Sequence, residues 1–259
     1  MNSCRKQLCL FFIAMGFLTR LPIPSWVEID TERLNQASRY FGLVGLIVGG
    51  VCASVFAITA IWLPVSIAIV LSMITSVVMT GGFHEDGLAD TADGFGGAWT
   101  AAEKLNIMKD SRLGSYGALA LVFALLFKWQ LLTEIALFDP NRVMVAFIIA
   151  HCLSRVLAAS LIFSETYVRD KRDSKVKPFA QFQSLNELFI LLLTAAGPLL
   201  FLGLWQAMVL VLSLLMVRIL LVAFFRGQIG GYTGDTLGAA QQVSELTCYF
   251  ILLILGMPL

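Results

Sequence analysis

An acidic segment with the chemistry of a metal site follows an apolar run in the first half of the chain. It reads His84-Glu-Asp-Gly-Leu-Ala-Asp-Thr-Ala-Asp-Gly94. If this segment is helical, Asp86, Asp90 and Asp93 stand at positions i, i+4 and i+7, within about 60° of one another around the helix axis. Three carboxylates would then share one face of a helix.

Carboxylates at that spacing repel one another, and solvation is poor directly after an apolar span, so they need protons or a cation. Mg²⁺ fits best, because it is a hard cation that prefers oxygen and commonly links carboxylates to substrate phosphates. We therefore predict that Asp86, Asp90 and Asp93 bind Mg²⁺. The plainer alternative is a solvated acidic connection whose aspartates cap helix N-termini.

His84 opens the acidic segment. With a pKa that lies near physiological pH, a histidine there could relay a proton or orient a carboxylate. It could equally be a polar residue at the membrane interface. Both interpretations stay open at this stage.

Two further groups of polar residues could contact an anionic substrate. Lys109 and Arg112 precede the next apolar run and could pair with phosphate, although positive charges there also anchor a membrane protein. Asp235 lies in a second glycine-rich segment, Gly230–Glu245, which we predict to be a loop facing substrate or metal. Arg155 lies inside an apolar run, where an unpaired cation is costly, so it faces an anionic substrate, an aspartate or a purely structural partner.

The composition identifies the solvent that surrounds most of the chain. Of the 259 residues, 58% are hydrophobic and 14% are charged, and the mean hydropathy is +0.84, which excludes an ordinary soluble domain. The basic residues cluster in particular connections and do not cover one face, so no nucleic-acid partner is expected. We predict one integral-membrane domain over residues 1–259, in contact with lipid.

Apolar runs of about 20 residues predict the membrane spans. We predict an all-α, polytopic bundle of about seven transmembrane helices. Its spans are Tyr40–Trp62, Pro64–Phe83, Tyr116–Phe138, Val143–Phe163, Leu188–Leu204, Ala207–Phe225 and Leu246–Leu259. The apolar run Leu8–Leu18 is shorter, which favours an interfacial or re-entrant helix at the N-terminus.

The distribution of positive charge predicts the orientation of the bundle. Residues 19–39, 84–115 and 164–187 contain eleven lysines and arginines, whereas the intervening turns contain only Arg142. This contrast places the three longer connections in the cytoplasm, and the parity of the spans places residues 226–244 there too. Both motif-bearing segments would then face the cytoplasm from the bacterial inner membrane.

Several motifs in this chain resemble those of the cobalamin synthase (adenosylcobinamide-GDP ribazoletransferase) family. They cover nearly the whole chain and occur in the expected order. They are Phe17-Leu-Thr-Arg-Leu-Pro-Ile-Pro24, Gly81-Gly-Phe-His-Glu-Asp-Gly-Leu-Ala-Asp-Thr-Ala-Asp-Gly94, Met108-Lys-Asp-Ser-Arg-Leu-Gly-Ser-Tyr-Gly117 and Gly231-Tyr-Thr-Gly-Asp-Thr-Leu-Gly-Ala239.

The resemblance implies the last assembly step of the cobalamin nucleotide loop. In that step adenosylcobinamide-GDP joins α-ribazole, or its 5′-phosphate, and GMP is released with Mg²⁺. It implies metal binding by the three aspartates, catalysis by His84 or an aspartate such as Asp93, and substrate contacts by Lys109, Arg112, Arg155 and Asp235. A homo-oligomer and contacts with other late cobalamin-assembly enzymes are left open.

One further similarity indicates only related Mg²⁺-dependent chemistry, and two other interpretations, a prenyltransferase and a transporter, compete with this one. The sequence Asp90-Thr-Ala-Asp93-Gly94 is also similar to the start of the CDP-alcohol phosphotransferase motif, but the Ala-Arg that follows in that motif is absent. An intramembrane prenyltransferase would carry a second aspartate-rich motif, and the second segment has Asp235 alone. A transporter would place its ionisable residues on broken helices near the bilayer midplane.

Overall fold

The computed structural model describes residues 3–169 and 180–256. Within these ranges the chain is helical, and its only strand-like contact is an isolated parallel bridge between Tyr167 and Tyr232. The elements are α1 (Ser3–Leu18), α2 (Thr31–Ala37), a 3₁₀ turn (Ser38–Tyr40), α3 (Phe41–Thr59), α4 (Val65–Thr80), α5 (Phe83–Gly97), α6 (Ala101–Ile107), α7 (Ser115–Phe138), α8 (Pro140–Ser164), α9 (Leu185–Leu199), α10 (Leu204–Ile229) and α11 (Gly234–Ile254). The all-α prediction is confirmed.

The helices α3, α4, α7, α8, α9, α10 and α11 correspond to the predicted spans. Among the described residues, five helical segments are long and apolar enough to cross a membrane, and they contain α3, α7, α8, α10 and α11. A sixth crossing is obtained if α4 and α5 count as one span, although the chain bends by 86° between them. Helix α9 has only 15 residues. Length and composition therefore give five or six crossings, where about seven were predicted.

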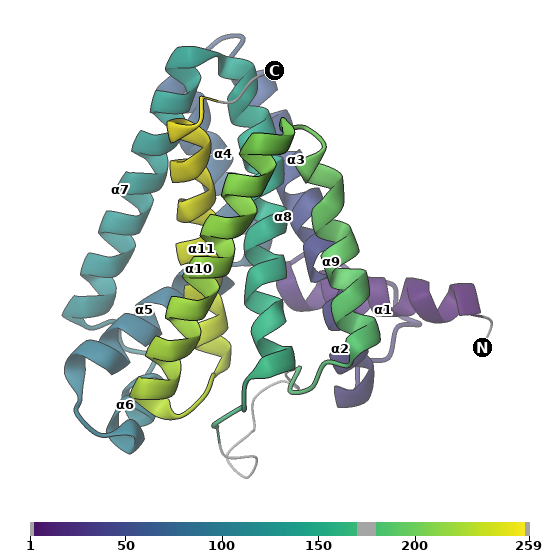
Figure 1. The fold of residues 1–259 in the computed structure, drawn as a ribbon, viewed down its shortest axis with the longest axis vertical. Helices are drawn as coiled ribbons and strands as arrows, with labels where there is room; N and C mark the ends of the chain where they lie inside the picture. Colours follow the sequence, from purple (N-terminus) through teal and green to yellow (C-terminus); the bar gives the residue numbers. More distant parts are fainter. Residues whose placement is uncertain (1–2, 170–179, 257–259) are drawn as a thin grey trace.

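The long helices run between two ends of the bundle that differ in character (Figure 1). The short turns after α3, α7 and α9 lie at the upper end, whereas α2, α5 and α6 lie at the lower end. Helix α1 lies across the long axis of the bundle, the direction expected of a helix along a membrane interface. The described parts of the longer connections therefore gather at one end, whereas Lys171, Arg172, Lys175 and Lys177 lie outside the described residues.

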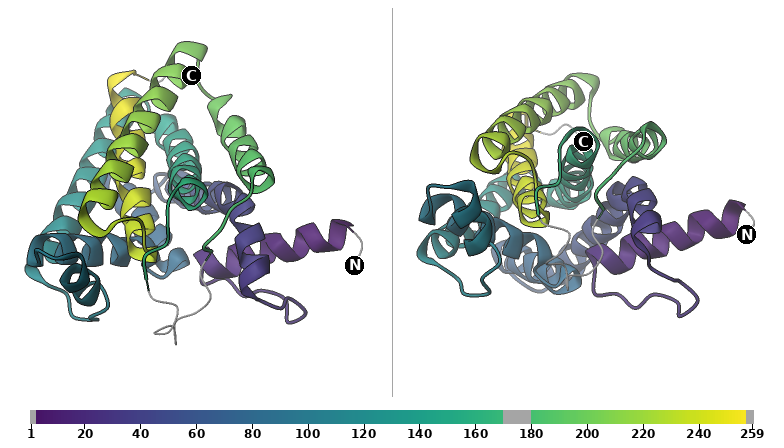
Figure 2. Two further views of the ribbon diagram at one scale, coloured as in Figure 1. Left: turned by 60° about the horizontal axis from the view of Figure 1, so that its bottom comes forward. Right: turned by 90° about the horizontal axis from the view of Figure 1, so that it is seen from below.

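Helix α8 forms the centre of the bundle, and α10 lies at its edge (Figure 2). Most of the apolar part of α8 is buried, whereas little of α10 is. Helix α3 approaches α8 closely because glycines of α3 face the backbone of α8. A Cβ atom on Gly45 would lie 2.3 Å from the His151 carbonyl oxygen, and one on Gly49 would lie 2.6 Å from that of Phe147.

The Gly45→Ala variant is expected to lose about 1–3 kcal/mol of stability, because the new methyl group must push α3 away from the α8 backbone. Gly50→Ala is the matched control, since nothing lies within 4 Å of a Cβ atom at Gly50. That change should stabilise the helix by about 0.5–1 kcal/mol. Unfolding by SDS in mixed micelles measures both effects, and equal stabilities of the two variants would contradict this packing.

The segment predicted as a second glycine-rich loop is mostly helical, and that prediction is wrong in its boundaries. Helix α11 begins at Gly234, about twelve residues before the predicted span Leu246–Leu259, whose last three residues lie outside the described part of the chain. The hydroxyl group of Thr233 accepts a hydrogen bond from the backbone N–H of Thr236 and so caps the helix. The polar residues that suggested a loop are instead buried inside the bundle.

Candidate active site

The acidic segment forms α5, a helix that turns sharply away from the end of α4. Gly81 and Gly82 join the two helices, and both have a positive φ, of 67° and 68° respectively. Glycine adopts this left-handed conformation at little cost, which allows the 86° bend. Helix α5 therefore runs across the lower end of the bundle and carries its carboxylates there (Figure 1).

Asp86 and Asp90 line a cavity of about 900 Å³ beside this bend. The walls come from α1, the chain after it, α2, the α4–α5 junction and the start of α7. Phe17, Ile29 and Leu34 supply apolar surface, so the two carboxylates face a half-apolar space. A cavity of this size accommodates a nucleotide-sized part of a ligand.

Asp235 adds a third carboxylate on this side of α5. Helices α5 and α11 cross closely, because a Cβ atom on Gly87 would lie 2.8 Å from the Asp235 carbonyl oxygen. Burial, together with the negative charges of Asp235 and Asp86, raises the pKa of Asp90 to about 7. Full ionisation of Asp86, Asp90 and Asp235 is therefore unfavourable, and a bound cation would reduce the repulsion among the three carboxylates.

Arg169 is the cation that already contacts this cluster. Its Nη2 atom lies 2.5 Å from Oδ2 of Asp235 and donates to the carbonyl oxygen of Met108 at 3.0 Å. The parallel bridge between Tyr167 and Tyr232 brings the two segments together. Sequence reasoning missed Arg169, which belonged to a basic run interpreted as topological.

Asp93, the third predicted metal ligand, also holds the start of α7. Its Oδ2 accepts the N–H of Gly114 at 2.7 Å, and its Oδ1 accepts that of Gly117 at 2.8 Å. Both glycines make room for the carboxylate, because a Cβ atom on either would lie 2.3 Å from one of its oxygens. Asp93 is buried and does not belong to the cavity lining.

The Asp93→Asn variant should lose about 1–3 kcal/mol of stability, since an amide can accept only one of the two backbone hydrogen bonds. SDS unfolding measures this loss. A Mg²⁺ titration of activity tests its predicted role as a ligand, because the Mg²⁺ concentration for half-maximal rate should then rise as well. Unchanged stability would contradict the structural role.

Lys109 and Arg112 lie between α6 and α7, and both are exposed. Arg112 pairs with Asp110 at 2.5 Å and keeps 87% of its side-chain surface in solvent. This arginine lowers the pKa of Asp110 to about 2 through its hydrogen bonds. Neither cation lines the cavity that contains Asp86 and Asp90.

His84 lies on the opposite side of α5 from Asp86, about 200° around the helix axis. It is buried, and it lines a smaller cavity of about 30 Å³ together with Arg155 and Gln241. Burial lowers the pKa of His84 well below its usual range, so the imidazole is neutral. The aromatic rings of Phe17 and Phe83 border both cavities. The structure therefore does not bring His84 to the carboxylates.

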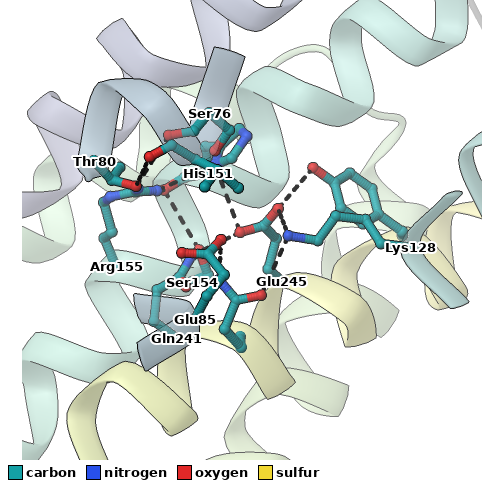
Figure 3. Close-up of polar contacts among 12 residues, drawn as sticks. Ser76, Thr80, Glu85, Lys128, His151, Ser154, Arg155, Gln241 and Glu245 are labelled. Carbon is teal, nitrogen blue, oxygen red and sulfur yellow. Dashed lines mark hydrogen bonds and ion pairs between the residues drawn. The ribbon is translucent and has the colours of Figure 1, made fainter. Parts of the chain in front are cut away.

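A buried polar cluster lies beyond His84, between α7, α8 and α11. Figure 3 shows Lys128, His151 and Gln241 pointing toward Glu245. Lys128 Nζ lies 3.0 Å from Glu245 Oε1, and Gln241 Nε2 donates to Glu245 Oε2 at 2.7 Å. Arg155 joins the cluster through His151, donating to its carbonyl oxygen at 2.9 Å.

The cluster reaches α5 through a second glutamine. Gln242 Nε2 donates to Glu85 Oε1 at 3.0 Å, and Lys128 Nζ donates to Gln242 Oε1 at 3.2 Å. Glu85 immediately precedes Asp86, so this contact fixes the rotation of α5 about its axis. The cluster thereby orients the face that carries the carboxylates.

Comparison with known proteins identifies the family. The family model described as cobalamin-5-phosphate synthase matches residues 10–253. The chain belongs to this family. Curated relatives named adenosylcobinamide-GDP ribazoletransferase include proteins of Shewanella pealeana, 66% identical over 99% of both chains, and Shewanella halifaxensis, 65% identical over 99% of both. The relative from Shewanella oneidensis is 60% identical over 98% of this chain and 97% of its own.

No solved structure matches the chain. Among its described residues, no three His, Cys, Asp or Glu side chains converge closely enough to hold one metal ion.

Of the polar cluster, only Arg155 was singled out in the sequence; Lys128, Gln241, Gln242 and Glu245 were missed, although one signal was present. Lys128 is a charge inside the predicted span Tyr116–Phe138, and an intramembrane charge calls for a partner. That partner is Glu245, which lay just before a predicted span and was assigned to a loop. No pattern in the sequence joins two positions so far apart.

Proposed function

We propose that this protein joins adenosylcobinamide-GDP to α-ribazole, or to α-ribazole 5′-phosphate, giving adenosylcobalamin or its 5′-phosphate and GMP. Family membership and the name shared by its relatives support this proposal. The structural observation that carries it is the pair Asp86 and Asp90, which face a cavity of about 900 Å³ at the charged end of the bundle.

In this reaction the ribose 3′-hydroxyl group attacks the phosphorus atom attached to the cobinamide arm. A new P–O bond forms, the P–O bond to GMP breaks, and GMP leaves with the bonding electrons. The proton of the hydroxyl group passes to a base. Positioning of the two substrates and stabilisation of phosphate charge supply most of the rate in such transfers.

We propose Mg²⁺ as the cofactor, held by Asp86 and Asp90 with Asp235 close by. Bound Mg²⁺ would neutralise charge on the phosphate oxygens and on the leaving GMP. The raised pKa of Asp90 supports this assignment, because burial and the negative charges of Asp235 and Asp86 both disfavour its ionised form, and a bound cation would counter them. Asp93 remains a predicted ligand, and its hydrogen bonds to α7 give it a positioning role as well.

The proposed base is a carboxylate of this site that the bound cation leaves free to accept the proton. His84, the other predicted candidate, is neutral but faces the cavity that contains Arg155. There His84 packs against α11, so we propose that it supports the reaction by holding α5 in position.

We propose that the site faces the cytoplasm from a bacterial inner membrane. The eleven basic residues in the longer connections, against one in the turns, support this orientation. Lys109 and Arg112 lie at the same end of the bundle, where they would attract the anionic substrates.

Purified protein in nanodiscs tests the proposal when it is given adenosylcobinamide-GDP and α-ribazole, with Mg²⁺ or with EDTA. We expect release of GMP, formation of the joined corrinoid and dependence on Mg²⁺. Release of pyrophosphate from an allylic diphosphate, supplied in a parallel assay, would indicate a prenyltransferase instead. Movement of an unchanged solute into vesicles would indicate a transporter.

A further inference from the structure

Arg20 lies in the large cavity with Asp86 and Asp90, at the point where the chain leaves α1. It is the only arginine or lysine among the residues that line this cavity. Its side chain is exposed to the cavity and forms no hydrogen bond or ion pair with any residue that the structure describes. In the sequence, Arg20 counted as one of the topological charges and stood in the motif Phe17–Pro24, but no role was assigned to it.

The chain holds Arg20 in place through its backbone and through the bend between α4 and α5. The N–H of Arg20 donates to the carbonyl oxygen of Met79 at 2.7 Å. A Cβ atom on Gly81 would lie 2.2 Å from Nε of Arg20, so the guanidinium group crosses Gly81 where only a glycine leaves room. The cation is thus directed over the start of the helix that carries the carboxylates.

Other arginines near this end of the bundle already have partners. These include Arg33 with Asp30, Arg39 with Glu187, Arg112 with Asp110, Arg169 with Asp235 and Arg226 with Glu165. A guanidinium group that is held in place, borders a cavity and lacks a partner is suited to bind a phosphate through paired N–H groups. Arg20 alone meets these conditions in the cavity of Asp86 and Asp90.

We propose that Arg20 binds the diphosphate group of the corrinoid substrate, opposite Asp86 and Asp90. This inference rests on the proposed function and names the residue that positions its phosphates. The carboxylates and their cation then contact one side of the diphosphate, and the guanidinium group contacts the other. Arg112 and Lys109 attract substrate from outside the cavity.

Three variants test this proposal: Arg20→Ala, Arg20→Lys and Arg20→Gln, with Arg33→Ala as the matched control. Arg33 is a nearby arginine that is paired with Glu28 and Asp30 and does not line the cavity. A lost charge-assisted contact should lower kcat/KM for adenosylcobinamide-GDP by about 10- to 100-fold in Arg20→Ala. Arg20→Lys should recover part of the loss, and the KM for α-ribazole should change less than about twofold.

Binding of GDP in the presence of Mg²⁺, followed by calorimetry, gives a second readout without turnover. Its affinity should fall by a similar factor in Arg20→Ala and Arg20→Gln, and should stay unchanged in Arg33→Ala. Arg20→Gln keeps part of the stem that crosses Gly81, so it remains informative if Arg20→Ala unfolds. SDS unfolding identifies a variant that has lost its structure.

The outcomes separate this proposal from the one on which it rests. If the wild-type protein releases no GMP, the proposed function fails. If the wild-type protein is active and both Arg20→Ala and Arg20→Gln keep full kcat/KM and full GDP affinity, the role of Arg20 is wrong and the proposed function stands. A rise in the KM for α-ribazole alone would also overturn the assignment.

Discussion

Replacing Asp86 or Asp90 with asparagine is expected to lower GMP release by about 100- to 1,000-fold, the range seen when one group that stabilises transition-state charge is removed. Both side chains face the cavity, and asparagine preserves their shape while removing the negative charge that attracts a cation. GMP release from adenosylcobinamide-GDP, measured across a range of Mg²⁺ concentrations, gives the size of the effect. Higher Mg²⁺ should restore part of the rate if the loss is in metal affinity.

The matched control for these two variants is Glu32→Gln, which removes a carboxylate from the exposed surface of α2. Its activity should match that of the wild-type protein. Full turnover in both Asp86→Asn and Asp90→Asn at limiting Mg²⁺ would refute the proposed metal site. Full turnover in only one of them would reduce the site to the other carboxylate together with Asp235.

The acidic helix could be predicted because its evidence is local. The i, i+4 and i+7 spacing of Asp86, Asp90 and Asp93 gives one face whenever the segment is helical, and α5 is helical over all three. The same local rule separates His84 from that face. What the spacing could not reveal is that Gly114 and Gly117 donate to Asp93, because that contact depends on how α7 approaches α5.

The boundaries of α11 were mispredicted for a physical reason. The glycines of the segment, together with Thr233, Asp235 and Thr236, led to the prediction of a loop, and the polar residues Gln241, Gln242 and Glu245 that follow did not suggest a span, since polar residues avoid lipid. Gln241, Gln242 and Glu245 are buried because side chains on α5, α7 and α8 form hydrogen bonds and an ion pair with them. The sequence alone indicates that burying such groups is unfavourable, but it does not show which partners satisfy them.

The contacts that complete the candidate site are also tertiary. Arg169 meets Asp235 across 66 positions, and Arg20 lies beside Gly81 across about 60. Neither pair follows a helical or strand period, so no spacing rule could join them. The sequence predicted which chemistry is present, whereas the fold decides which cation lies next to which carboxylate.

Breaking the buried ion pair in the centre of the bundle is expected to have the largest effect on stability. Lys128→Met should cost about 3–5 kcal/mol, because Glu245 would keep a buried negative charge without its cation. Glu245→Gln should cost a similar amount by leaving Lys128 uncompensated, since the two side chains are only 5% and 2% exposed. SDS unfolding in mixed micelles measures each loss.

The double variant Lys128→Met with Glu245→Gln distinguishes an ion pair from simple packing. With both charges removed, no uncompensated charge remains, so its loss should be well below the sum of the two single losses. Glu134→Gln, on α7 less than two turns beyond Lys128 and hydrogen-bonded to Gln130 at the surface, is the control and should change stability by less than about 0.5 kcal/mol. Additive losses in the double variant would show that the charges act independently. Gln242 links Lys128 to Glu85 on α5, so each single variant should also lower the activity of the protein that stays folded. The double variant should regain part of that lost activity.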